Sequence, residues 1–122
     1  MDPVSPREKL LEELARLGVR HTPSKVVAIG RNAAGTIVFL EQGNARAGLE
    51  HILLQHGEDF SRRGIDEVMI PDAILNAVID GKRVGVQGTR PVYEVEFNGQ
   101  VHVIAVTVGD NGFIVGANPA TR

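Results

Sequence analysis

The residues whose types and spacing could do chemistry in this sequence are His51, His56, Arg90 and Thr107. An imidazole can take up and return a proton near neutral pH, an arginine can bind two phosphate oxygens at once, and a threonine hydroxyl can donate a hydrogen bond to a phosphoryl oxygen. Such groups suit metal-free cleavage of RNA. In that reaction a base activates the ribose 2′-hydroxyl, cations stabilise the charge that develops on the phosphate, and an acid protonates the leaving oxygen.

The two histidines lie in a short apolar stretch, residues 48–60, that predicts a helix. Asn44 is the expected N-cap of this helix, and Gly57 marks its expected end. At about 100° per residue, His51 lies roughly 140° around the helix from His56. A zinc-binding pair of histidines needs a spacing of four residues, so this pattern excludes that pair and favours proton transfer or hydrogen bonding.

Each candidate also has a structural interpretation. His56 lies on the apolar stripe of its helix, so a buried histidine bonded to a backbone carbonyl is an equal alternative to a catalytic one. Arg90 could be an exposed cation at a strand end, and Thr107 is a residue type common in strands. Tyr93 falls on the expected core face, where packing is its default role. His102 is expected to fill the core or the sheet edge.

Length and composition define one domain, residues 1–122, with an N-terminal helical segment (1–20) and a core (21–119). The chain has no cysteine, which excludes disulfides, thiolate nucleophiles and cysteine-based metal sites. Its net charge of −2 argues against a non-specific nucleic-acid binder but allows a local basic cleft. No apolar run could cross a bilayer, and no signal segment is evident. No metal-ligand spacing is evident either, so neither a metal nor a cofactor is expected.

The order of elements indicates an α+β fold, with early helices packed on a late antiparallel sheet. Helical spacing and caps predict helices at 6–17 and 70–81, beside the histidine helix. The β-branched runs 25–29 and 36–40 predict a hairpin, and His21 before it is expected to be a solvated turn residue. Alternating runs then predict four strands, at residues 83–86, 92–97, 101–108 and 113–117.

The Asn98-Gly99 pair between two of these strands is a strong hairpin signal and fixes their register. Phe97 then faces Gln100, and the residues 93, 95, 97, 102, 104, 106 and 108 share the face that packs on the helices. If pairing continues past residue 91, Arg90 lies across from Thr107 on the other face.

The last hairpin has two possible registers. If Asn111-Gly112 is its turn, Thr107 faces Gly116, and Asn118 joins the face of Arg90. Gly116 would then leave room beside the threonine for a ligand. If the turn is one residue earlier, Thr107 faces Ile114 and this grouping fails.

The chain resembles the C-terminal toxin domains of large bacterial secreted proteins of the contact-dependent growth inhibition and filamentous haemagglutinin type. These domains belong to the superfamily named after barnase, EndoU, the colicin ribonucleases and RelE (BECR). The segments that carry the resemblance are His21-Thr22-Pro23, 26–29, 35–40, Gly43-Asn44, 47–52, His56, Phe60, Gly64-Ile65, 90–93, 106–109 and 111–115. They span about residues 22–119.

The resemblance implies metal-independent RNA cleavage, most often of transfer RNA, and no cofactor. It also implies a cognate immunity protein, secretion as part of a larger cell-surface protein, and action in the cytoplasm of a target cell, where a protein co-factor could assist RNA capture. Carried over onto this sequence, His51 takes the acid/base role, and Arg90 and Thr107 are the phosphate partners. His56 and Tyr93 match pattern positions without an assigned role, and Asn118 is a further candidate for substrate binding.

Two other functions compete with this one. The chain could be a non-catalytic binding module that docks a partner through the valine-rich face of Val92, Val101 and Val103. A nuclease acting on DNA is a weaker alternative, because carboxylates with metal-ligand spacing are not evident.

Overall fold

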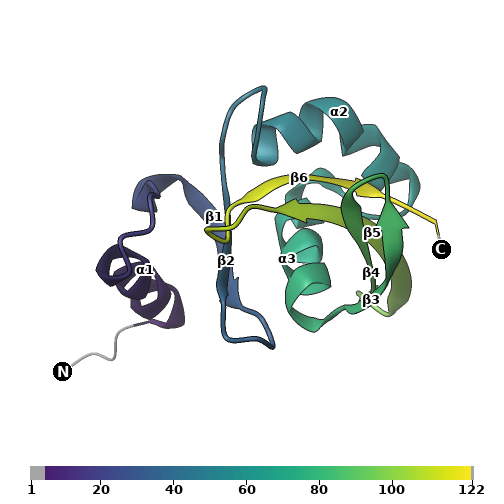
Figure 1. Cartoon of the computed structure of the whole chain (residues 1–122). Helices are drawn as coiled ribbons and strands as arrows, with labels where there is room; N and C mark the ends of the chain where they lie inside the picture. Colours follow the sequence, from purple (N-terminus) through teal and green to yellow (C-terminus); the bar gives the residue numbers. More distant parts are fainter. Residues whose placement is uncertain (1–4, 122) are drawn as a thin grey trace.

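The computed structural model describes residues 5–121, and within them the chain folds as three α-helices, two short 3-10 helices and six strands (Figure 1). The elements, in chain order, are α1 (Pro6–Arg16), η1 (Pro23–Lys25), β1 (Val26–Arg31), β2 (Ile37–Glu41), α2 (Leu49–Arg62), η2 (Glu67–Met69), α3 (Ile70–Asp80), β3 (Lys82–Gln87), β4 (Arg90–Phe97), β5 (Gln100–Val108) and β6 (Ile114–Pro119). The predicted α+β class is therefore confirmed. None of the described helices is long and apolar enough to cross a membrane.

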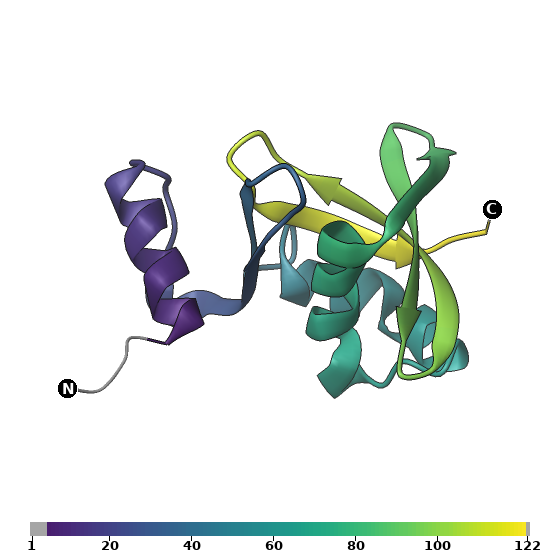
Figure 2. The ribbon, with the colours of Figure 1, turned by 90° about the horizontal axis from the view of Figure 1, so that it is seen from below.

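The first helix begins as its sequence predicts. The side chain of Ser5 accepts a hydrogen bond from the backbone N–H of Glu8, and proline occupies the first turn. However, α1 does not pack on the late sheet. Its buried Leu14 joins Val26, Ile37 and Phe39 in a small core of its own against the β1–β2 hairpin. Figure 2 shows α1 at one end of the molecule, with the β1–β2 hairpin between it and the larger sheet.

The late sheet has the strand order β3-β4-β5-β6, and every neighbouring pair is antiparallel. The register predicted from Asn98-Gly99 is confirmed, because Phe97 pairs with Gln100 and Val92 with Ala105. Both turn residues have positive φ angles, which the tight hairpin requires. Strand β4 begins at Arg90, two residues before the predicted start.

The last hairpin takes the register that brings the polar residues together. Thr107 pairs with Gly116, and Ala105 pairs with Asn118. The turn nevertheless differs from both predictions, because Val108 pairs with Ile114 after a register shift. A bulge therefore absorbs one residue of β6, and residues 109–113 form the connection between the two strands, in which Gly112 has a φ of 90°.

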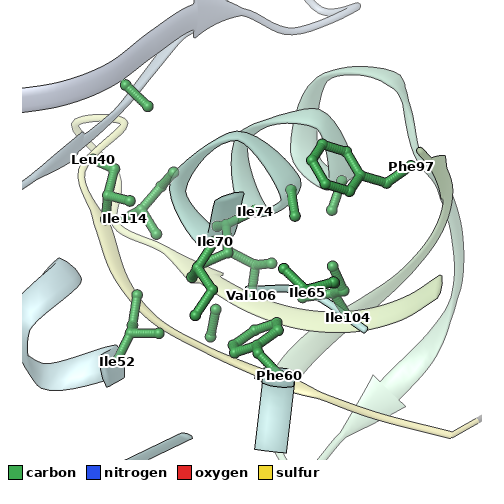
Figure 3. Close-up of a cluster of buried hydrophobic side chains, with 14 of the residues drawn as sticks. Leu40, Ile52, Phe60, Ile65, Ile70, Ile74, Phe97, Ile104, Val106 and Ile114 are labelled. Carbon is green, nitrogen blue, oxygen red and sulfur yellow. The ribbon is translucent and has the colours of Figure 1, made fainter. Parts of the chain in front are cut away.

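Helices α2 and α3 cover one face of the four-stranded sheet, as predicted, and together they bury the main core. Figure 3 shows its large side chains: Ile52 and Phe60 from α2, Ile70 and Ile74 from α3, and Ile104 and Val106 from the sheet, with Leu40 and Ile114 nearby. Helix α2 packs along β6, whereas α3 packs on β4 and on the β1–β2 hairpin.

The histidine helix differs from its prediction at both ends. It begins at Leu49 with Gly48 as its N-cap, and it continues through Gly57 to Arg62. Asn44 does not cap the helix; its side-chain oxygen instead accepts the backbone N–H of Arg46, which forms a turn before the helix. The glycine signal at 57 fails because the apolar stripe continues to Phe60, which is fully buried.

Candidate functional site

A row of four polar side chains crosses the sheet on the face opposite α2 and α3. Arg90 on β4 donates from Nε to Oγ1 of Thr107 on β5 at 2.8 Å, and from Nη1 to Oδ1 of Asn118 on β6 at 2.9 Å. Asn118 in turn donates from Nδ2 to Oε1 of Gln87 on β3 at 2.8 Å. Each of the four strands thus contributes one member. The predicted grouping of Arg90, Thr107 and Asn118 is present.

Gly116 has a different use from the one predicted. A Cβ atom added at this residue would lie 3.0 Å from Nη2 of Arg90. The space beside Thr107 is therefore filled by the guanidinium itself and not left open for a ligand. The glycine lets the arginine lie flat across β6 while it bonds to both neighbours.

The charge of Arg90 is not neutralised by a carboxylate within residues 5–121. Its partners there are a hydroxyl and an amide oxygen, both uncharged, and it forms no ion pair. The guanidinium has five N–H groups and uses two of them, so three remain on Nη1 and Nη2. A half-buried cation with fixed orientation and free donors is suited to bind an oxyanion such as a phosphate.

His51 lies in the first turn of α2 and is half-buried. Its Nδ1 lies 2.9 Å from the carbonyl oxygen of Ala45. A carbonyl can only accept, so Nδ1 carries the proton and Nε2 of the neutral ring is left as a proton acceptor. The carbonyl is presented by the tight turn in which the N–H of Asn44 bonds to the oxygen of Ala47 at 2.9 Å.

Strand β6 connects the histidine helix to the arginine. The N–H of Gly48 donates to the carbonyl of Val115 at 2.9 Å, so α2 starts beside the outer edge of β6. The guanidinium of Arg90 lies over the next residue, Gly116. No hydrogen bond joins His51 to Arg90 or Thr107 in the described chain. Figure 2 shows α2 on one side of β6 (yellow) and the turn between β3 and β4 on the other.

The other two predicted site residues lie elsewhere. Nδ1 of His56 is 3.0 Å from Oδ2 of Asp59 on the same helix, and both side chains are partly exposed. The predicted alternative of a bond to a backbone carbonyl is therefore wrong for His56. Tyr93 packs against the main core on the helix-covered face. It stands on the opposite face from Asn118, so the two do not form one binding surface.

Sequence reasoning missed a second polar site on the helix-covered side of the sheet. His102 is buried, as expected, but it borders a groove that also contains Arg63 from the end of α2. Burial, together with the positive charge of Arg63, lowers the pKa of His102 from its ordinary value. No spacing in the sequence relates these two residues, which are brought together only by the packing of α2 on the sheet.

His21 is not the solvated turn residue that the sequence predicts. Its Nδ1 bonds to the carbonyl of Val19 at 2.8 Å, and its ring packs edge-on against Phe39 at 6.3 Å between centroids. Its Nε2 is buried without a hydrogen-bond partner among the described residues. The neighbours Arg20, Thr22 and Pro23 are exposed as a turn predicts, and only the ring of His21 is turned inward.

The valine-rich docking face of the alternative hypothesis is much reduced. Val92 is only 3% exposed, because it packs with Ala105 and Ala120 and is flanked by Val84 and Val103. Val101 is 66% exposed, and of the three named valines it alone is an exposed side chain.

No group of three or more histidine, aspartate or glutamate side chains gathers in a metal-binding arrangement between residues 5 and 121. Comparison with models of known protein families gave no match, and neither did comparison with curated protein sequences.

Proposed function

We propose that this chain is an antibacterial toxin domain that cleaves RNA without a metal ion, with Arg90 as its phosphate-binding residue. The observation that supports this most strongly is the cation of Arg90, which is fixed by uncharged partners and has three N–H donors without a partner in the described part of the chain. The family resemblance of residues 22–119 extends the proposal to transfer RNA as the substrate.

In the proposed reaction, Nε2 of His51 accepts the proton of a ribose 2′-hydroxyl, and the 2′-oxygen attacks the neighbouring phosphorus. The phosphorane that forms carries an additional negative charge, which the free N–H groups of Arg90 and the hydroxyl of Thr107 stabilise. The bond from phosphorus to the 5′-oxygen then breaks, and that oxygen takes a proton from an acid. His56, whose Nδ1 is held by Asp59, is the candidate for this acid.

Three features support His51 as the base. Its ring is not sealed in the core, its tautomer is set by the Ala45 carbonyl, and α2 begins beside the residue of β6 that precedes Gly116. Arg90 lies on the sheet face opposite α2, so an RNA substrate would meet its N–H groups on one side of the edge strand β6 and His51 on the other side. Asn118 is assigned a positioning role, because it holds Nη1 of Arg90.

The biological setting of the proposal comes from the resemblance. The domain would be secreted as part of a larger cell-surface protein, act in the cytoplasm of a target cell, and be neutralised by a cognate immunity protein in the producing cell. A net charge of −2 gives the chain little general attraction for RNA. A protein co-factor in the target cell is therefore included as a partner.

Incubating the purified domain with total bacterial RNA, with and without cell extract, tests the proposal. Cleavage of transfer RNA by the wild type, with none by Arg90→Gln, is the expected result. No cleavage in either condition would contradict it. Growth inhibition that survives the loss of both His51 and Arg90 would favour the non-catalytic binding module.

A further inference from the structure

A groove of about 680 Å³ opens between the end of α2 and the strands β5 and β6. Its inner wall is apolar and includes Phe60, Ile65 and Pro119. Figure 3 shows Phe60 and Ile65 together with Ile104 at this end of the core. Its polar groups include the side chains of Arg63 and Gln100. An apolar cleft with a few convergent polar groups is the common form of a small-ligand site.

His102 also borders the groove, and its ring makes no hydrogen bond with the described chain although only 9% of the residue is exposed. Among the described residues, only Nε2 of His21 is a fully buried side-chain nitrogen without a hydrogen bond, so the ring nitrogens of His102 keep some solvent access and can bond to a group in the groove. Burial and the nearby charge of Arg63 lower the pKa of His102, which favours the neutral form of the ring. A neutral ring offers one N–H donor and one acceptor nitrogen.

Arg63 supplies a positive charge that is held in place. Its Nη1 donates to the carbonyl of Ala120 at 2.9 Å, and its other four N–H groups have no partner among residues 5–121. None of the described residues that line the groove is an aspartate or a glutamate. The groove is therefore positive in a chain whose net charge is −2, and an anionic ligand suits it.

We propose that this groove binds one nucleotide, with its base between the apolar walls and its phosphate on Arg63. A flat heterocycle carries donors and acceptors along its edge, which the neutral ring of His102 and the amide of Gln100 can pair with. As a subsite for the RNA substrate, this assignment rests on the proposed function.

The groove lies close to the Arg90 cluster along the chain but on the other face of the sheet. Pro119 lines the groove, and the residue before it, Asn118, accepts the hydrogen bond from Arg90. Consecutive residues of a strand point to opposite faces. An RNA strand that passes around the end of β6 would therefore meet Arg90 on one face and Arg63 on the other.

The test is a titration of the intact domain with AMP, GMP, CMP and UMP, in which NMR of the histidine ring protons reports binding. Inorganic phosphate serves as the probe for simple anion binding. At least one nucleotide should shift the His102 ring signals, which are assigned with His102→Gln, and should bind more tightly than phosphate. Arg63→Gln should weaken this binding about tenfold, as expected for the loss of a charge-assisted contact.

Arg62→Gln is the matched control, because Arg62 is 73% exposed and faces Glu58 and Asp59 on its own helix. It should leave nucleotide binding unchanged. Thermal unfolding of each variant shows whether the loss of the bond to Ala120 has loosened the fold. Arg63→Lys, which keeps the charge, should recover part of the affinity.

Three results would overturn the assignment: no binding of any of the four nucleotides, binding that leaves the His102 signals in place, or binding lost in Arg90→Gln but kept in Arg63→Gln. The subsite and the proposed function fail separately. A domain that binds nucleotides at His102 but cuts no RNA keeps the subsite and loses the ribonuclease. RNA cleavage without any nucleotide effect on His102 keeps the ribonuclease and loses the subsite.

Discussion

The guanidinium of Arg90 lies against Gly116, so that a Cβ atom added to the glycine would be 3.0 Å from Nη2 of the arginine. This pair explains how Arg90 joins the strands β4, β5 and β6 within the polar row. The arginine bonds to Thr107 on the neighbouring strand and to Asn118 on the next while it lies over a residue without a side chain. A Cβ atom at that residue would require the guanidinium to shift by a few tenths of an ångström.

Gly116→Ala should therefore reduce RNA cleavage more than it reduces stability. The contact is with the end of a flexible side chain, so we expect the free energy of unfolding to change by less than about 1 kcal/mol. Displacing the guanidinium should lower the cleavage rate roughly tenfold. Gly85→Ala is the control, since it lies in the same sheet and nothing lies within 4 Å of its added Cβ. Equal activity of the two variants would show that the position of Arg90 is irrelevant to cleavage.

Thr107→Val should leave Nε of Arg90 without its acceptor while keeping the shape of the side chain. Hydrogen bonds to charged groups contribute about 1.5–3 kcal/mol, so cleavage should fall roughly 10- to 150-fold. Thr107→Ser, which retains the hydroxyl, should keep most of the activity. Measured cleavage rates and urea unfolding curves of both variants separate a loss of the site from a loss of the fold.

His51→Asn should abolish cleavage and preserve folding. An asparagine amide can still donate to the carbonyl of Ala45, but it offers no nitrogen that can accept a proton. His56→Asn removes only a partly exposed pair with Asp59, so its effect on stability should be below about 0.5 kcal/mol. The rate of RNA cleavage by His56→Asn shows whether His56 is the acid. Full cleavage by His51→Asn would exclude His51 as the base.

The stability of the domain should fall as the pH drops below about 6.5, the ordinary pKa of histidine. The pKa of His102 is lower in the folded state, because burial and Arg63 disfavour the imidazolium. The unfolded chain therefore binds more protons, and the stabilisation that is complete above 6.5 decreases towards acid. Urea unfolding between pH 7.5 and 5 measures this. His102→Gln should show a shallower decrease, and an identical slope would contradict the account.

The fold was largely predictable because its signals are local. The capping box at Ser5, the turn at Asn98-Gly99 and the alternation along β4 and β5 each act over a few residues. The ends of α2 were not predictable from local signals. The burial of Phe60 against distant elements extends the helix and outweighs the helix-ending tendency of Gly57.

The candidate site was predictable where register alone determines it. Once the last hairpin takes its register, Thr107 must face Gly116, and Asn118 must share the face of Arg90. Two features lie beyond such reasoning. The path of the Arg90 side chain over Gly116 and the meeting of His102 with Arg63 depend on how side chains and helices pack across the sheet.

The most direct test of the central claim is the chemistry of the RNA ends made by the purified domain. Attack by the 2′-hydroxyl at a phosphate held by Arg90 predicts fragments that end in a 2′,3′-cyclic phosphate and begin with a 5′-hydroxyl. It also predicts that Arg90→Gln makes no such fragments. Fragments with 5′-phosphate ends, or the same cyclic ends at an undiminished rate from Arg90→Gln, would contradict the account.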